Sequence, residues 1–338
     1  MIRVFIFFFS FSTAILATGP INMTKEKQEG NATLAAGPIN MTKEKQDGNA
    51  TLAAGPMNMT KDKQEDKAIL TFGLIADIQY CDCESHGTRF YSHSLNKLDE
   101  AIEDFNRSEA EFIINLGDLI EKDFRSFGPV LELMRKSKRA IFHLPGNHDY
   151  SVRQRYKKRV TRMLAGEEGY YSFSRDGFRF IALNSCDIST YSGSLRSRFK
   201  AGAMLARLQR EGYNNAFDWN GAIGRKQISW FKSELAEARE MSQGVFIFSH
   251  HPPAPEGAHT LYNRQEMLDI VSGYDNIIAW FSGHKHEGDY GYYSDIHFVT
   301  LKAVVETADT NSRALVEVYG NYLLIKGRGR EESRKLDY

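Results

Sequence analysis

Hydrophobic and polar residues alternate in a regular way only after about residue 69. From there on, short apolar runs rich in β-branched and aromatic residues predict strands. Between them, stretches with an apolar residue at every third or fourth position predict amphipathic helices at residues 92–106, 127–138 and 223–240. The pairs Asp176-Gly177 and Gly320-Asn321 each separate two apolar runs and predict β-hairpins. This order of elements predicts an α/β fold in which two sheets have helices outside them.

The first residues have the features of a secretory signal peptide, which we predict at residues 1–18. Met1-Ile2-Arg3 carries one positive charge, and an apolar run extends from Val4 to about Ala17. That run is shorter than the ~20 residues that a membrane-spanning helix needs. Secretion is therefore the expectation, and an uncleaved signal anchor is the alternative.

Residues 19–68 contain an 18-residue repeat, which reads GPINMTKEKQEGNATLAA in its first copy. This composition is too polar to bury an apolar core, so we predict a disordered spacer. The spacer carries five N-x-T sequons, which indicate a secreted glycoprotein, and they begin at Asn22, Asn31, Asn40, Asn49 and Asn58. A duplicated linker with no selected role is the alternative.

The overall composition is that of a globular protein with an appendage. The chain has 338 residues, of which 42% are hydrophobic, and this is ample for one large domain, predicted at 69–330 and followed by a C-terminal tail, 331–338. Forty-three basic and 43 acidic residues give a formal net charge of zero. A balanced charge gives no general reason to expect nucleic acid or a membrane surface as partner, and we expect a monomer without stable membrane association. Three cysteines leave at least one thiol without an intramolecular partner, and the pairing of Cys81, Cys83 and Cys186 stays open.

Five of the apolar runs end in side chains that bind metal ions. The runs are FGLIADIQ, FIINLGD, IFHLPGNHD, VFIFSHH and IIAWFSGHKH, and the residues at their ends are Asp77, Gln79, Asp118, Asn147, His148, His250, His284 and His286. In α/β folds, ligand sites lie beyond the carboxyl ends of the strands, so these side chains are expected to meet at one edge of a sheet. A carboxylate such as that of Asp118 can bridge two cations ~3.5–4 Å apart. The pattern therefore predicts a two-metal hydrolase.

The ordered motifs D-x-Q, G-D, G-N-H-D, a lone His and G-H-x-H resemble those of the calcineurin-like metallophosphoesterase superfamily over residues 70 to 330. The resemblance implies a four-layer sandwich of two mixed sheets flanked by helices. It implies a first metal site formed by Asp77, Gln79, Asp118 and His286. It implies a second metal site formed by Asp118, Asn147, His250 and His284. A water that bridges two such cations loses a proton readily and becomes the nucleophile.

Further roles follow from the same resemblance. His148 would assist the leaving group, and Asp149 would orient His148. His251 follows His250 directly, and in an extended chain the two side chains point to opposite faces, so the resemblance favours His250 as the ligand. Arg89 is a candidate phosphate clamp, with a surface salt bridge as the alternative.

Gln79 narrows the choice within the superfamily, since most members have His at that position. An amide oxygen is a harder donor than imidazole and favours Mn²⁺ or Mg²⁺ over Zn²⁺, although zinc and iron stay open. The D-x-Q motif resembles the branch of manganese-dependent ADP-ribose/CDP-alcohol diphosphatases, as do Gly87-Thr88-Arg89, Trp219-Asn220-Gly221 and the stretch around Glu306. This resemblance implies that nucleoside diphosphate derivatives are cleaved at the phosphoanhydride bond. ADP-ribose would give AMP and ribose 5-phosphate, and CDP-choline would give CMP and phosphocholine.

Two other functions stay open on the sequence alone. One is a broad-specificity phosphatase or cyclic-nucleotide phosphodiesterase of the same superfamily, and the other is a secreted nucleotide-binding protein without activity. Purple acid phosphatases are excluded, because Glu121 stands where they need a tyrosine ligand. The polar, arginine-rich stretch 191–220 shows no clear element and is expected to be a loop over the site. Trp219, Tyr170 and Tyr171 are candidates for stacking on a nucleobase, with core packing as the simpler interpretation.

Overall fold

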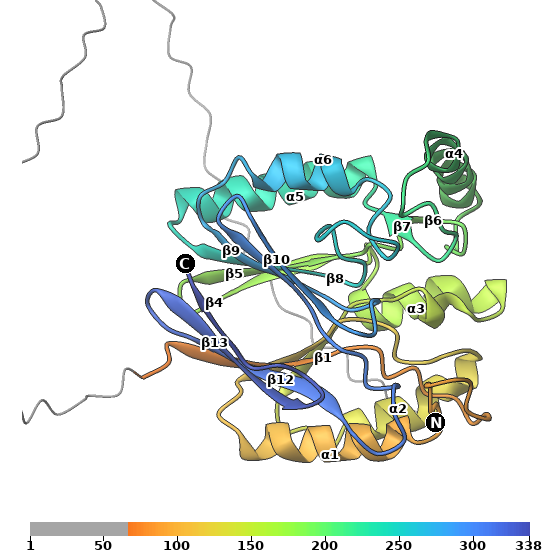
Figure 1. Ribbon diagram of the computed structural model, residues 1–338, viewed down its shortest axis with the longest axis horizontal. Helices are drawn as coiled ribbons and strands as arrows, with labels where there is room; N and C mark the ends of the chain where they lie inside the picture. Colours follow the sequence, from red (N-terminus) through yellow and green to blue (C-terminus); the bar gives the residue numbers. More distant parts are fainter. Residues whose placement is uncertain (1–66) are drawn as a thin grey trace, which may run out of the picture. The chain divides into compact units, whose positions relative to one another are not determined.

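The computed structural model describes residues 67–338 (Figure 1). The predicted signal peptide, the sequons from Asn22 to Asn58 and nearly all of the repeat spacer lie outside the described residues.

Two six-stranded mixed sheets pack face to face, as the sequence predicts. The first sheet has the order β14-β13-β12-β1-β2-β3, and the second has the order β10-β11-β9-β8-β5-β4. The strands of the first sheet are β1 (Leu70–Ile75), β2 (Phe112–Asn115), β3 (Ala140–His143), β12 (Ser312–Val318), β13 (Tyr322–Gly329) and β14 (Arg334–Asp337). Those of the second are β4 (Tyr171–Arg175), β5 (Phe178–Leu183), β8 (Gly244–Ser249), β9 (Ile277–Ser282), β10 (Asp289–Tyr293) and β11 (Ile296–Thr300). A short separate sheet pairs β6 (Ile188–Ser189) with β7 (Gly221–Ala222).

Phenylalanine side chains fill the space between the two sheets. Phe72, at the centre of β1, stacks on Phe112 of β2 with ring centroids 5.5 Å apart. Its ring also makes edge contacts with four rings from the second sheet, those of Phe180, Phe246, Phe248 and Phe281. Because the rings of the two inner faces pack against one another, they hold the two sheets at a fixed distance and angle.

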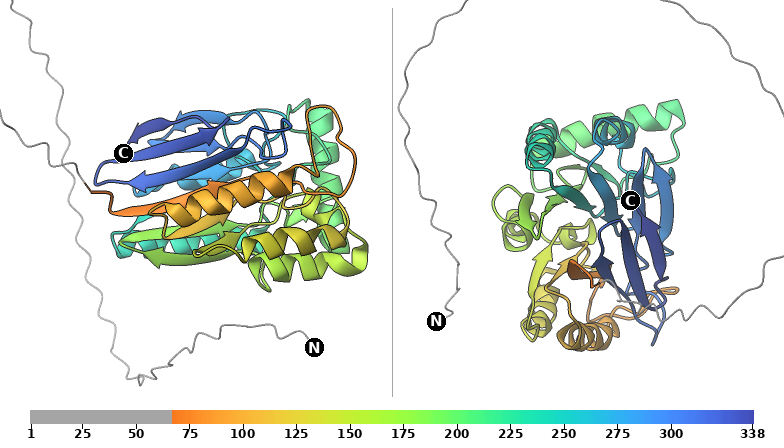
Figure 2. Two further views of the ribbon diagram at one scale, coloured as in Figure 1. Left: turned by 90° about the horizontal axis from the view of Figure 1, so that it is seen from below. Right: turned by 90° about the vertical axis from the view of Figure 1, so that its left-hand side faces the viewer.

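Helices cover both outer faces and complete the four layers (Figures 1 and 2). The first sheet is covered by α1 (Ser94–Arg107) and α2 (Phe127–Met134), and the second by α5 (Arg225–Glu240) and α6 (Arg264–Val271). The three predicted helices and the two predicted hairpins are confirmed, although α2 ends earlier than expected. At the first hairpin, Asp176 and Gly177 have φ of 47° and 84°, the left-handed values that a tight turn of this kind requires.

Two expectations for the domain were wrong. Residues 191–220 contain a helix, α4 (Leu195–Glu211). Its N-cap is Ser194, whose side chain accepts a hydrogen bond from Ser197 N, and its C-cap is Gly212, which has a left-handed conformation. This helix buries only Ala201 and Leu208 fully, so its sequence shows little of the periodicity that would reveal it. The expected tail, 331–338, contributes β14, which pairs with β13 and extends the first sheet.

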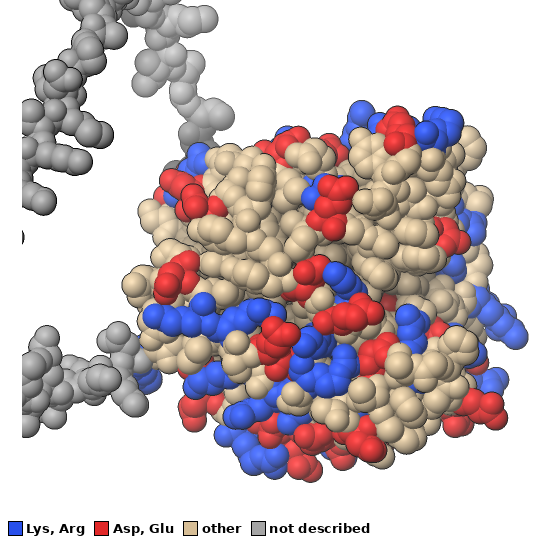
Figure 3. All heavy atoms as spheres, in the orientation of Figure 1, with Lys and Arg blue, Asp and Glu red and all other residues tan. Residues whose placement is uncertain are grey.

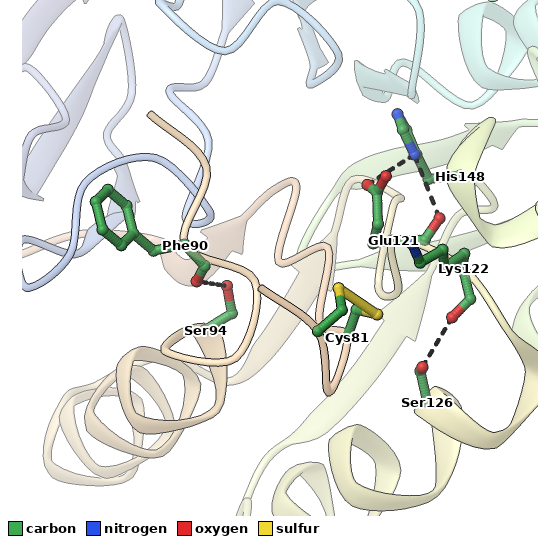
Figure 4. Close-up of a disulfide and its surroundings, with 8 residues drawn as sticks. Cys81, Phe90, Ser94, Glu121, Lys122, Ser126 and His148 are labelled. Carbon is green, nitrogen blue, oxygen red and sulfur yellow. Dashed lines mark hydrogen bonds and ion pairs between the residues drawn. A yellow bond between two sulfur atoms is a disulfide. The ribbon is translucent and has the colours of Figure 1, made fainter. Parts of the chain in front are cut away.

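The cysteines divide into a pair and a free thiol. Cys81 and Cys83 form a disulfide in the loop after β1 (Figure 4), and Cys186 is buried and free.

One more helix, α3 (Gln154–Ala165), lies between β3 and β4 in the chain. Among residues 67–338, no helix combines the length and the hydrophobicity needed to cross a membrane.

Candidate metal centre

The registers of the two sheets bring the predicted ligands to one end of the sandwich. Ile75, Asn115 and His143 align at the carboxyl ends of β1, β2 and β3. Ser249 and Ser282 align in the same way at the ends of β8 and β9. The chain leaves each of these strands into a loop that carries one or two ligands. The structure therefore brings together all seven predicted metal ligands, which are Asp77, Gln79, Asp118, Asn147, His250, His284 and His286.

One group of ligand atoms surrounds the Gln79 amide. Gln79 Nε2 lies 3.1 Å from Asp118 Oδ2 and 3.1 Å from His286 Nε2, while Gln79 Oε1 is buried and has no hydrogen-bond partner. Turning the amide by half a rotation would exchange its two atoms and aim the oxygen at the same point as the other two acceptors. Three acceptors that converge without a proton between them are satisfied by a cation. The residues present therefore fit a first metal ion.

A second group surrounds the His250 ring. His250 Nδ1 donates to Leu116 O over 2.9 Å, which leaves the Nε2 lone pair 3.0 Å from Asn147 Oδ1 and 3.3 Å from Asp118 Oδ2. Burial lowers the pKa of His250, but the negative charge of Asp118 outweighs it and raises that pKa to about 9. A positive charge is thus favoured at Nε2, and a divalent cation supplies it as well as a proton does. These atoms fit a second metal ion that shares Asp118 with the first.

The backbone at the site is held in a conformation that side-chain-bearing residues rarely adopt. Asp77, Gln79, Asp118 and His284 have φ of 53°, 43°, 55° and 71°. Each such residue costs about 1–3 kcal/mol and persists only when its surroundings fix it. The close packing of Gly146 against Asp118 helps to fix this backbone, because a Cβ at Gly146 would lie 2.1 Å from Asp118 Oδ1. The chain therefore stores strain where it aims its ligands.

The contacts of Asp149 differ from those expected. Its carboxylate does not contact the His148 ring and instead accepts hydrogen bonds from backbone N–H groups, at 2.9–3.3 Å, of Gly146, Asp118, Leu119 and Ile120. Asp149 thus joins the loops that follow β2 and β3 and positions the Asp118 backbone. The sequence could not show this, because a buried carboxylate finds its donors only when the two loops meet.

His148 is oriented by a different carboxylate. His148 Nδ1 lies 2.9 Å from Glu121 Oε2 (Figure 4), and the backbone N–H of His148 donates to Asp118 Oδ1. Burial lowers the pKa of His148, but the negative charges of Asp118 and Glu121 raise it to about 9. A protonated, partly exposed imidazole beside the metal ligands is suited to donate a proton to a leaving oxygen.

Glu306 and Asn220 belong to the site, although the sequence alone assigned no role to either. Glu306 Oε1 accepts a hydrogen bond of 2.6 Å from His286 Nδ1, and this bond lowers the pKa of Glu306 to about 2. Asn220 Oδ1 lies 3.0 Å from His284 Nε2. Both orient a ligand histidine from behind, which is how proteins fix the tautomer and the ring position of a metal-binding imidazole. In the sequence, both residues belong to stretches that resemble the diphosphatase branch, Trp219-Asn220-Gly221 and the stretch around Glu306.

Arg89 and His251 have protein partners. Arg89 Nε lies 3.7 Å from Glu306 Oε1 at the rim of the site, so this guanidinium has an ion-pair partner among the site residues. His251 Nδ1 is 2.7 Å from Ser185 Oγ, and its Nε2 is 3.1 Å from Trp219 O. Burial and the charge of His250 lower the pKa of His251 to about 3. Because both of its ring nitrogens have protein partners, His251 fits a supporting role better than that of a metal ligand.

The comparisons with known proteins agree with this geometry. Residues 70–288 match the family described as calcineurin-like phosphoesterase. The chain belongs to that family. This phosphoesterase is 28% identical over 319 residues to a human protein named manganese-dependent ADP-ribose/CDP-alcohol diphosphatase, covering 79% of this chain and 92% of the relative. It is 29% identical over 300 residues to the Arabidopsis thaliana protein of that name, covering 78% and 95%.

A solved structure has the same fold. It is a dimetal phosphatase from Danio rerio, with a TM-score of 0.73 and 23% identity, and the match covers 80% of this chain and all of that one. The expected four-layer fold is thereby confirmed. As a family member, this phosphoesterase is a metal-dependent hydrolase, in which bound cations supply Lewis acidity to phosphate oxygens and to water. The residues that would hold them are the two groups around Gln79 and His250.

Proposed function

We propose that this protein is a manganese-dependent diphosphatase that hydrolyses the phosphoanhydride bond of ADP-ribose and of CDP-alcohols. One observation carries the proposal: the amide of Gln79 occupies a buried ligand position, 3.1 Å from Asp118 Oδ2 and from His286 Nε2. A hard amide oxygen in place of a third imidazole favours manganese over zinc. The names of the human and Arabidopsis thaliana relatives support the same activity.

The rim of the site supports a nucleotide as substrate. Phe217 and Trp219 stack with ring centroids 4.3 Å apart, and each is 39% exposed. His259 lies 6.5 Å from the Trp219 ring and 5.3 Å from the ring of the ligand His284. An exposed aromatic pair that is linked to a metal ligand through His259 offers a flat surface to a nucleobase whose phosphates reach the cations.

The other two stacking candidates pack within the protein. Tyr171 donates a hydrogen bond to His143 O and belongs to the core edge, and Tyr170 packs on Trp230. Of the three, only Trp219 has a ring contact with His259, which in turn contacts the ligand His284.

The chain's own groups divide the work of the reaction. Arg89, at the rim, is placed to attract the anionic substrate. His148 holds a proton next to the leaving oxygen, and Glu121 keeps its ring in place. Glu306 and Asn220 fix the rings of His286 and His284.

The activity test uses the purified protein, stripped of metal and then given Mn²⁺, Mg²⁺ or Zn²⁺. ADP-ribose, CDP-choline and bis-nitrophenyl phosphate are offered in parallel. The expected result is manganese-dependent release of AMP and CMP. It should fall at least about 100-fold in Asn147→Ala, because loss of a residue that only supports a ligand already costs 10–100-fold. Hydrolysis of the nitrophenyl diester alone would overturn the diphosphatase and favour the phosphodiesterase alternative.

A substitution at Gln79 tests the metal preference. Gln79→His restores the residue that most superfamily members have at this position, and it should shift activation from manganese toward zinc. An unchanged metal preference would show that Gln79 does not select the metal.

We also propose that the protein is secreted and that its repeat spacer is glycosylated. The apolar run after Arg3 and the sequons from Asn22 to Asn58 support this proposal. Expression in a eukaryotic cell should place the protein in the medium, with a mass that falls on treatment with an N-glycosidase. Full-length, unglycosylated protein in the cytosol would contradict it.

A further inference from the structure

Two helices, α3 and α4, concentrate positive charge in a chain whose net charge is zero. Residues 153–162, which run from the N-cap of α3 into that helix, include six Lys or Arg, and residues 195–210, on α4, include five. Neither segment contains Asp or Glu. Figure 1 shows both helices at the right-hand edge, and Figure 3 shows that Lys and Arg recur along that edge. We call these two segments the α3–α4 surface.

The start of α3 contacts the segment that leads into α4. Gln154 Nε2 donates to Gly193 O over 2.7 Å, and Lys157 Nζ donates to Tyr191 O over 2.5 Å. Burial and the positive charge of Arg198 lower the pKa of Lys157. The basic residues at the start of α3 therefore lie next to the segment that leads into α4.

Most of these cations have no acidic partner. Within residues 67–338, ion pairs to carboxylates account for Arg162 and Arg207 alone among them, each with a Glu near it in sequence. The cations that pair with no carboxylate there are Arg153, Arg155, Lys157, Lys158, Arg159, Arg196, Arg198, Lys200 and Arg210. Unneutralised like charges repel one another, so an anionic partner would stabilise this arrangement.

The outward side of α4 adds an apolar element. Leu195 is 76% exposed and Phe199, one turn later, is 84% exposed, and they are the two most exposed large hydrophobic residues among those the structure describes. Exposed Gly202 and Ala206 continue the same side at helical spacing. Arg196, Lys200, Arg198 and Arg210 flank it. An apolar stripe bordered by cations is the pattern of a helix that lies in a membrane interface.

We propose that the α3–α4 surface docks on an anionic lipid bilayer, with Leu195 and Phe199 entering the headgroup region and the cations contacting lipid phosphates. A soluble polyanion would leave the two apolar side chains without a partner. A second copy of the chain would bring like charges together. Each cation near a charged bilayer adds roughly fivefold to the affinity, so the surface is strong enough for reversible attachment.

Vesicle flotation tests the proposal with the full chain. Phosphatidylcholine vesicles are compared with vesicles in which part of that lipid is replaced by phosphatidylserine. We expect binding that requires phosphatidylserine and weakens with salt. It should fall at least about tenfold in Leu195→Ser/Phe199→Ser and in Arg196→Glu/Lys200→Glu. The matched controls are Met241→Ser, another exposed apolar residue, and Lys232→Glu/Arg328→Glu, the same charge change elsewhere; both should bind normally.

The apolar run from Val4 to Ala17 is common to all variants, so differences between them report on the α3–α4 surface. A local reporter separates the two further. In Phe199→Trp, the added tryptophan should be quenched by brominated lipid in anionic vesicles. Equal binding by all variants, or absence of that quenching, would overturn the proposal. So would binding of heparin without vesicle binding, or self-association that the Leu195→Ser/Phe199→Ser variant abolishes.

Discussion

Glu306 accepts a hydrogen bond of 2.6 Å from Nδ1 of His286, and this bond leaves Nε2 of the same ring 3.1 Å from the Gln79 amide. A carboxylate behind a ligand histidine fixes its tautomer and raises its basicity. Glu306→Gln keeps the shape and removes the charge. We expect manganese affinity and kcat/KM to fall about 10–100-fold. Activity titrated against Mn²⁺ checks this, and recovery at high Mn²⁺ would distinguish lost affinity from a misfolded site.

Asp149 should matter to the fold as much as to the reaction. Its buried carboxylate accepts four backbone N–H groups from the loops after β2 and β3. Asp149→Asn places an NH₂ group against donors and should lower the free energy of unfolding by about 2–3 kcal/mol. Chemical denaturation measures it. If stability were unchanged while activity fell, Asp149 would act by orienting His148, as the sequence predicted.

Gly146 tolerates no side chain in this structure. A Cβ at Gly146 would lie 2.1 Å from Asp118 Oδ1 and 2.5 Å from Asp118 N. Gly146→Ala should therefore displace the shared ligand, with a loss of stability of about 1–3 kcal/mol and most of the activity. Gly128, in α2, has nothing within 4 Å of such a Cβ. Gly128→Ala should keep full activity and gain about 0.5–1 kcal/mol, which makes it the control.

The contribution of Lys97 to the free energy of unfolding should increase at alkaline pH. Its ammonium is buried beneath the site, where it donates to Val304 O, Glu306 O and Thr307 O. Burial lowers the pKa of Lys97 to about 8. Between pH 8 and the usual lysine value of about 10.4, the unfolded chain binds more protons than the folded one, so the contribution of Lys97 to stability increases with pH.

Comparison with Lys97→Met isolates this contribution. The difference in unfolding free energy between the two proteins should move in favour of the unsubstituted protein across that pH window. A difference that stays flat would mean that Lys97 keeps an ordinary pKa in the folded state.

Local patterns predicted most of the elements. The helices α1, α2 and α5 and the two hairpins have the spacing or the turn residues that their geometry requires, because each of these features depends on neighbours along the chain. The helix α4 escaped detection because it buries only two residues fully. The strand β14 escaped because a short edge strand is defined by its partner, β13.

The sequence by itself determined the donor types and their order, and with them the family and the chemistry of a two-metal hydrolase. A ligand must be a particular side chain, and its position after a strand can be read from the hydrophobic pattern. Only the tertiary structure decided that Asp149 holds two loops, that Glu121 orients His148 and that Glu306 supports His286. It also decided where the charge lies, because net charge is a sum over the chain, whereas the α3–α4 surface arises where the start of α3 meets the segment that leads into α4. Contacts between distant residues depend on which elements meet in space, and no local pattern encodes that.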